Sequence, residues 1–126
     1  QIAQSLDFDK VTILGVENRS NIWRNRKHSW MHVPIRLNSV PSRELLHRAI
    51  SFLENEGIET RPPLTGNFVR QPAMSQFASK VNIVEDFPVA DEISNSTFLI
   101  GCHHDLSDSQ VDFLCDRLRL LCSKII

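Results

Sequence analysis

The sequence lacks the features that mark membrane, disulfide-bonded and nucleic-acid-binding proteins. No apolar run approaches the ~20 residues that a membrane-spanning helix needs, and no signal peptide is visible. The three cysteines, Cys102, Cys115 and Cys122, are odd in number and show no regular spacing, so no disulfide framework is expected. The net charge of -1 argues against general nucleic-acid binding. We therefore expect a cytoplasmic protein with no membrane and no nucleic-acid partner.

The sequence also lacks the common phosphate-binding and nucleophile motifs. It contains no G-x-G-x-x-G, no P-loop and no G-x-S-x-G. Residues 102–105, Cys-His-His-Asp, are all of metal-binding types. Neighbouring residues on a strand face opposite sides, however, so we expect a strand-to-helix turn here and no metal site. Cys102 and His103 are too close in sequence for a typical catalytic pair, and no catalytic residue is assigned.

What is present indicates one globular domain. The 126 residues are 41% hydrophobic and 23% charged, and they contain no internal repeat. Residues 10–16 form a β-rich run. In residues 29–37 apolar and other side chains alternate, which predicts a strand with one apolar face. Because Pro34 cannot donate to a ladder, we expect this strand at an edge or bulged.

Further elements are marked by their end signals. Ser42 predicts the cap of a helix that ends at Gly57. Pro88 opens a short helix, and Ser107 with Gln110 forms a capping box for the last one. Between these lie an extended piece at 58–61, a loop at 65–72 and a strand at 97–100. This order predicts an α+β fold, a small mixed or antiparallel sheet with helices packed on one face.

The loop 65–72 is the best candidate for binding. Gly66 permits unusual backbone angles, and Asn67, Arg70 and Gln71 supply directed hydrogen-bond groups. The Arg70 guanidinium suits a carboxylate or phosphate, which it can bind through two parallel hydrogen bonds. A capped surface turn without a ligand explains the same residues. From the residues alone, both interpretations stay open.

Several blocks in order resemble a known family. They are the strand 29–37 with its ending Pro-Ile-Arg-Leu, the segment 55–61, the loop Gly66-Asn67-Phe68-Val69-Arg70-Gln71-Pro72, and residues 90–107. Together they are similar to the C-terminal part of the DegT/DnrJ/StrS sugar aminotransferases, which have the aspartate-aminotransferase fold type. The loop is most similar to the branch that includes nucleotide-sugar 3-dehydratases. Residues 1–28 match poorly.

The resemblance implies a single C-terminal small domain over residues 1–126, with the large cofactor-binding domain absent. The parent enzyme would use pyridoxal or pyridoxamine phosphate on a keto-sugar nucleotide, in surface polysaccharide or deoxysugar biosynthesis. Asn67 and Arg70, with Trp30 as a further candidate in the cleft wall, would contact that substrate. No cofactor is expected in this chain by itself, and we expect it to be inactive.

Alternatives to this interpretation remain. Within the class, the parent reaction is either dehydration or amino transfer, and the residue that decides between them lies outside this chain. In a different class, the chain is an independent α+β binding or regulatory module. Under the main interpretation, the expected partners are the missing large domain and, in the parent, the nucleotide sugar. An exposed apolar surface left by the missing domain would favour a homo-oligomer.

Overall fold

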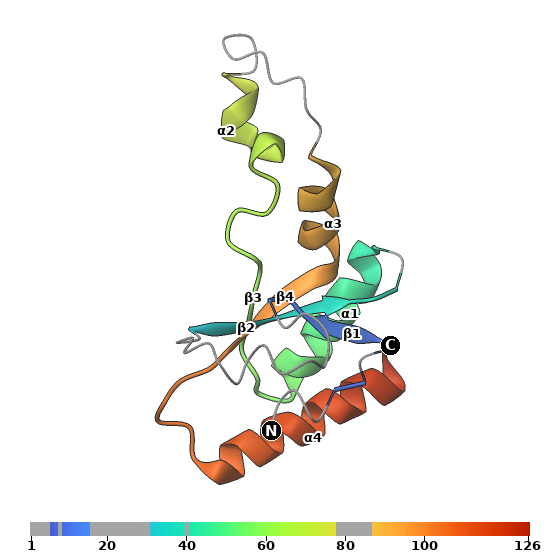
Figure 1. Cartoon of the computed structure of the whole chain (residues 1–126), viewed down its shortest axis with the longest axis vertical. Coiled ribbons are helices and arrows are strands. Elements are labelled where there is room, and N and C mark those ends of the chain that lie inside the picture. The colour runs from blue at the N-terminus through green and yellow to red at the C-terminus, as the bar shows by residue number, and fades with distance from the viewer. Residues whose placement is uncertain (1–5, 8, 16–30, 40, 78–86) are drawn as a thin grey trace.

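The computed structural model describes residues 6–7, 9–15, 31–39, 41–77 and 87–126. Four antiparallel strands form one sheet in the order β1-β2-β4-β3 (Figure 1). The strands are β1 (Val11–Ile13), β2 (His32–Leu37), β3 (Thr60–Arg61) and β4 (Thr97–Gly101). The helices are α1 (Arg43–Asn55), the 3-10 helix η3 (Phe68–Arg70), α2 (Pro72–Ser75), α3 (Pro88–Ser96) and α4 (Asp108–Lys124).

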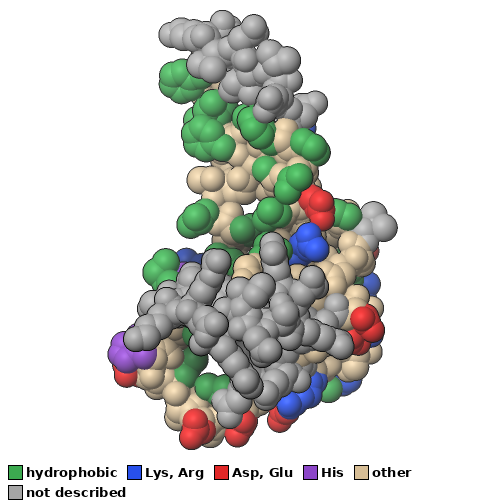
Figure 2. Space-filling view, in the orientation of Figure 1, with side chains coloured by type: hydrophobic (Ala, Val, Ile, Leu, Met, Phe, Trp, Pro, Cys, Tyr) green, Lys and Arg blue, Asp and Glu red, His purple; other side chains and the backbone are tan. Residues whose placement is uncertain are grey.

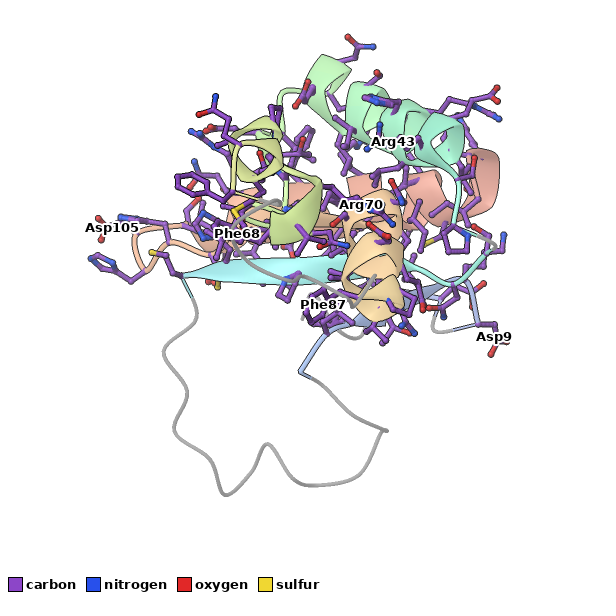
Figure 3. All side chains as sticks on the ribbon, turned by 90° about the horizontal axis from the view of Figure 1, so that it is seen from above. Asp9, Arg43, Phe68, Arg70, Phe87 and Asp105 are labelled. Carbon is purple, nitrogen blue, oxygen red and sulfur yellow. The ribbon has the colours of Figure 1, made fainter. Side chains whose placement is uncertain are left out.

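The core lies on one face of the sheet. The register pairs Ile35 with Phe98 and with Ile13, and because paired residues point the same way, these side chains share a face. All three are buried, with exposures of 4% or less. The helices α1 and α4 pack on this face and add Leu53 and Leu118, both fully buried (Figure 3). The predicted α+β fold with helices on one face is thereby confirmed.

Local capping sets the ends of α1 and α4 as predicted. The Ser42 hydroxyl accepts a hydrogen bond from the backbone N–H of Leu45. The Ser107 hydroxyl and the Gln110 side chain form the reciprocal capping box at the start of α4. After α1, Gly57 takes a φ of +81°, the left-handed conformation that glycine adopts without a Cβ penalty. These caps fix how the two helices meet the sheet.

The expectation that Pro34 lies at a sheet edge is wrong. β2 is an interior strand, paired with β1 on one side and β4 on the other. The Pro34 carbonyl accepts a hydrogen bond from Leu14 N at 3.0 Å, one residue beyond the end of β1. In an antiparallel pair the nitrogen of a residue faces the same neighbour as its carbonyl. The missing N–H therefore faces the point at which β1 ends, so the sheet loses little by accepting a proline.

Residues 62–77 and 87–96 project from the sheet, and we call their described part the arm (Figure 1). The predicted loop is more regular than expected: the Asn67 side chain caps η3 by accepting from Val69 N, and Pro72 opens α2. None of the arm's described residues belongs to the buried apolar cluster of the sheet. Apolar side chains instead cover its surface (Figure 2): Leu64, Phe68, Phe77, Phe87 and Val89 are all more than 40% exposed.

Candidate functional site

Asn67 is the buried centre of the predicted binding loop. The residue is only 5% exposed. The amide nitrogen donates to the Phe87 carbonyl at 3.3 Å and to Asp91 Oδ1 at 2.8 Å. The amide oxygen accepts from Val69 N at 3.2 Å. A buried amide needs such partners, and Asn67 consequently ties η3 to the first turn of α3.

Arg70 stands at the end of η3, beside α3 (Figure 3). Its Nε and Nη2 donate to Asp91 Oδ2 at 3.3 Å and 3.1 Å, yet its side chain remains 58% exposed. Hydrogen bonds from Arg70, and next from Asn67, lower the pKa of Asp91, whereas partial burial of the carboxyl opposes this shift. Arg70 is thus both held by a carboxylate of its own domain and open to solvent.

Sequence reasoning paired Asn67 with Arg70 and missed the group that joins them. In the structure both side chains donate to Asp91: Asn67 Nδ2 to Oδ1 and Arg70 Nη2 to Oδ2. The available signal was an acidic residue in the first turn after Pro88, where it also suits the positive end of a helix. The third candidate, Trp30, lies outside the described residues.

A close backbone approach explains Gly66 in this loop. Its φ is +61°, and a Cβ built there would lie 2.7 Å from Ser94 Oγ of α3. Any side chain at this position would therefore combine left-handed strain with a clash. Glycine lets the chain turn tightly against α3 just before Asn67 enters its buried position.

The run 102–105 forms a turn after β4, as predicted, because the strand ends at Gly101 and Leu106 N donates to the His103 carbonyl. Strand alternation therefore does not separate these side chains. Ligand-type atoms of His103, His104 and Asp105 lie within 4.8 Å of one another, and all three residues are exposed. Since His103 Nδ1 already accepts from Asp105 N, and exposed clusters of this kind form without an ion, we assign no role to it.

Pyridoxal phosphate is held in its enzymes by a lysine, and the described lysines do not fit that role. Lys10 Nζ donates to the Cys122 carbonyl at 2.7 Å, which anchors the chain before β1 to α4. Lys124 is exposed at the last turn of α4. We therefore assign neither of these two described lysines to the cofactor. Among the described helices, none is long and apolar enough to cross a bilayer.

The comparisons with known proteins agree with the fold. The sequence profile of the DegT/DnrJ/EryC1/StrS aminotransferase family matches residues 6–119, and the chain belongs to this family. A search of curated proteins finds no match.

Solved structures of Spr1654 from Streptococcus pneumoniae, named as a sugar aminotransferase, share the fold. Its apo form superposes with a TM-score of 0.62 at 18% identity, covering 75% of this chain and 22% of the other. Its pyridoxamine-phosphate and pyridoxal-phosphate forms each give 0.53, again at 18% identity, covering 75% of this chain and 23% of the other. This chain therefore spans less than a quarter of the length of the solved structures that it matches.

Proposed function

We propose that this chain is the C-terminal, substrate-facing part of a pyridoxal-phosphate-dependent enzyme that acts on a keto-sugar nucleotide. The observation that carries the proposal is the family match over residues 6–119, together with a structural match that covers only 22% of a sugar aminotransferase. The cofactor would supply the electron sink for amino transfer or dehydration. The cofactor-binding part would come from a longer polypeptide, so the chain alone would be inactive.

Within this proposal, Arg70 is the residue that contacts substrate. It is exposed, and its guanidinium suits the phosphates and hydroxyls of a nucleotide sugar. The buried amide of Asn67 holds the loop in place, and its own contact with substrate stays a prediction. Trp30 remains a prediction for the wall of the cleft.

Substrate contact can be tested on the isolated chain by NMR. Addition of UDP-glucose or dTDP-glucose should shift the Arg70 Nε resonance and the amides of 68–71 in the wild type, and Arg70→Ala should remove the amide shifts. Arg61→Ala is a matched control, since Arg61 is similarly exposed and pairs with Glu59. Equal shifts in the wild type and the Arg70 variant would contradict a role for Arg70.

In a polypeptide that also carries a cofactor-binding domain, Arg70→Ala should lower kcat/KM about ten- to a hundredfold. That range corresponds to the loss of one charge-assisted hydrogen bond. The melting temperature should change little, because the Arg70 side chain is 58% exposed in its pair with Asp91 and ion pairs near the surface stabilise weakly. A lower melting temperature with unchanged kinetics would make Arg70 a structural residue only.

The cofactor assignment is tested by exposing the chain alone to pyridoxal phosphate. Reduction with borohydride followed by peptide mapping should find no stoichiometric label on any of the four lysines, Lys10, Lys27, Lys80 and Lys124. Lys10 is committed to the Cys122 carbonyl, and Lys124 has no enclosing site. Specific labelling of one lysine would show that the chain holds the cofactor by itself, and would contradict the proposal that another part of the polypeptide binds it.

The exposed apolar surface of the arm would dock against the cofactor-binding domain. Large exposed apolar patches usually mark interaction sites, and Leu64 is 91% and Phe68 59% exposed. In the isolated chain the same surface favours self-association, which Leu64→Ser with Phe68→Ser should reduce in sedimentation velocity. A chain that stays monomeric at millimolar concentration would count against this docking surface.

A further inference from the structure

Asp91 is the meeting point of the two halves of the arm. Its Oδ1 accepts from Asn67 Nδ2 at 2.8 Å, and its Oδ2 accepts from Arg70 Nη2 at 3.1 Å and Nε at 3.3 Å. Its side chain is 31% exposed. Hydrogen bonds to a charged carboxylate are stronger than neutral ones. One carboxylate of α3 therefore holds both ends of η3.

Apolar packing does not replace these bonds. No described residue of the arm joins the buried apolar cluster, and Phe68 and Phe87 direct much of their surface to solvent. Two further contacts lie between this loop and α3: the hydrogen bond from Asn67 to the Phe87 carbonyl and the close approach of Gly66 to Ser94. The position of η3 consequently depends on polar contacts, and three of these hydrogen bonds end on the Asp91 carboxylate.

We propose that Asp91 is a positioning residue: it clamps η3 against α3 and so fixes the direction in which Arg70 presents its guanidinium. The use of that direction for substrate rests on the proposed function, but the clamp itself does not. Removing the Asp91 carboxylate removes two hydrogen bonds from Arg70 and one from Asn67 together. The 3-10 helix is then held less firmly against α3, while the sheet and α4 stay folded.

The neighbouring residue provides a matched control. Glu92 carries the same charge one position further along α3, and its Oε1 accepts from Arg36 Nη1 of β2 at 3.3 Å. It therefore joins α3 to the sheet through Arg36. Glu92→Gln removes one charge from the same helix, so any general effect of charge on α3 appears in both variants.

The first test is amide hydrogen exchange across the 126-residue chain. Asp91→Ala should raise exchange of the Val69, Arg70 and Gln71 amides about three- to tenfold, the range for a lost charge-assisted bond at a partly exposed site. Asp91→Asn, which keeps the shape, should give a smaller increase, and Asp91→Glu should restore part of the protection. Amides of α1 and α4 should be unchanged in every variant, and Glu92→Gln should leave 69–71 as in the wild type.

The second test reports on the guanidinium itself. Trypsin binds the arginine side chain in an acidic pocket, so cleavage at Arg70–Gln71 requires Arg70 to leave Asp91. Asp91→Ala should speed this cleavage several-fold, whereas Glu92→Gln should not. Phe68→Ala is a control that alters η3 but keeps the Asp91 carboxylate. If cleavage depends on release of Arg70 and not on a general loosening of η3, Phe68→Ala should change the cleavage rate less than Asp91→Ala.

Unchanged exchange at 69–71 and unchanged cleavage in Asp91→Ala would overturn the clamp, whatever Arg70 does with substrate. Equal effects of Asp91→Ala and Glu92→Gln would overturn it as well. The opposite combination, a clamp that behaves as expected and nucleotide sugars that shift no Arg70 resonance, would refute only the proposed function.

Discussion

The sheet with α1 and α4 and the projecting arm are stabilised by different means. In the sheet region, residues such as Phe98 and Leu118 are fully buried, and polar groups serve mainly as caps. In the arm, the large apolar side chains are exposed, and hydrogen bonds from Asn67 and Arg70 to Asp91 connect the η3 segment to α3. The first region contains the buried apolar cluster that stabilises the fold. The second leaves its large apolar side chains exposed, as the docking surface proposed above requires.

This contrast separates stability from function. Substitutions in the sheet region should change the free energy of unfolding of the whole chain, because its core is a single cluster. Substitutions in the arm should change local opening and binding while the melting temperature stays nearly constant.

The largest effect is expected for a matched pair of phenylalanines. Phe98→Ala removes a fully buried ring from β4 and should lower the free energy of unfolding by about 3–5 kcal/mol. Phe68→Ala removes a ring that is 59% exposed and should change it by less than about 0.5 kcal/mol. Urea denaturation followed by circular dichroism measures both. Similar losses of unfolding free energy in the two variants would mean that the arm unfolds cooperatively with the core.

An intermediate effect is expected for two glycines with positive φ. Gly57→Ala adds a Cβ that meets nothing within 4 Å, so it carries backbone strain alone, about 1–2 kcal/mol. Gly66→Ala adds the contact with Ser94 Oγ at 2.7 Å. It should therefore speed hydrogen exchange in the arm, and Ser94→Ala in the same chain should recover part of the protection. Recovery by Ser94→Ala of all the lost protection would show that backbone strain at Gly66 is negligible.

The smallest effect is expected on acidification. The pKa of Asp91 is lowered in the folded chain, and hydrogen bonding from Arg70 is the first cause. The charged carboxylate therefore adds to the stability of the folded chain at pH values above the ordinary aspartate range. This added stability is lost as the pH falls through the lowered pKa. Arg70 and Arg43, whose charges also favour the carboxylate, stay charged throughout. In an NMR titration of the Asp91 carboxyl carbon, Arg70→Gln should raise the midpoint, and Arg61→Gln should leave it in place.

Sequence reasoning was most successful where a structure depends on near neighbours. The ends of α1 and α4 follow from Ser42, Gly57 and the Ser107–Gln110 box, each of which acts within four residues. The site was harder to predict because its partners are distant: Asp91 is 21 residues from Arg70 and 24 from Asn67. No periodicity links such positions. The family resemblance pointed to Asn67 and Arg70, but only the three-dimensional structure shows the carboxylate between them.

The same limit explains the error at Pro34, and its position has a consequence for assembly of the sheet. Leu14 and Pro34 face each other at the end of the β1–β2 ladder, where the carbonyl of Pro34 is used and no N–H is required. If β1 slid by two residues so that Thr12 faced Pro34, a ladder bond would be missing in the middle of the strand. A shift by one residue would turn Val11 and Ile13 away from the core. The proline thus discriminates among alignments that a short, three-residue strand could otherwise sample during folding.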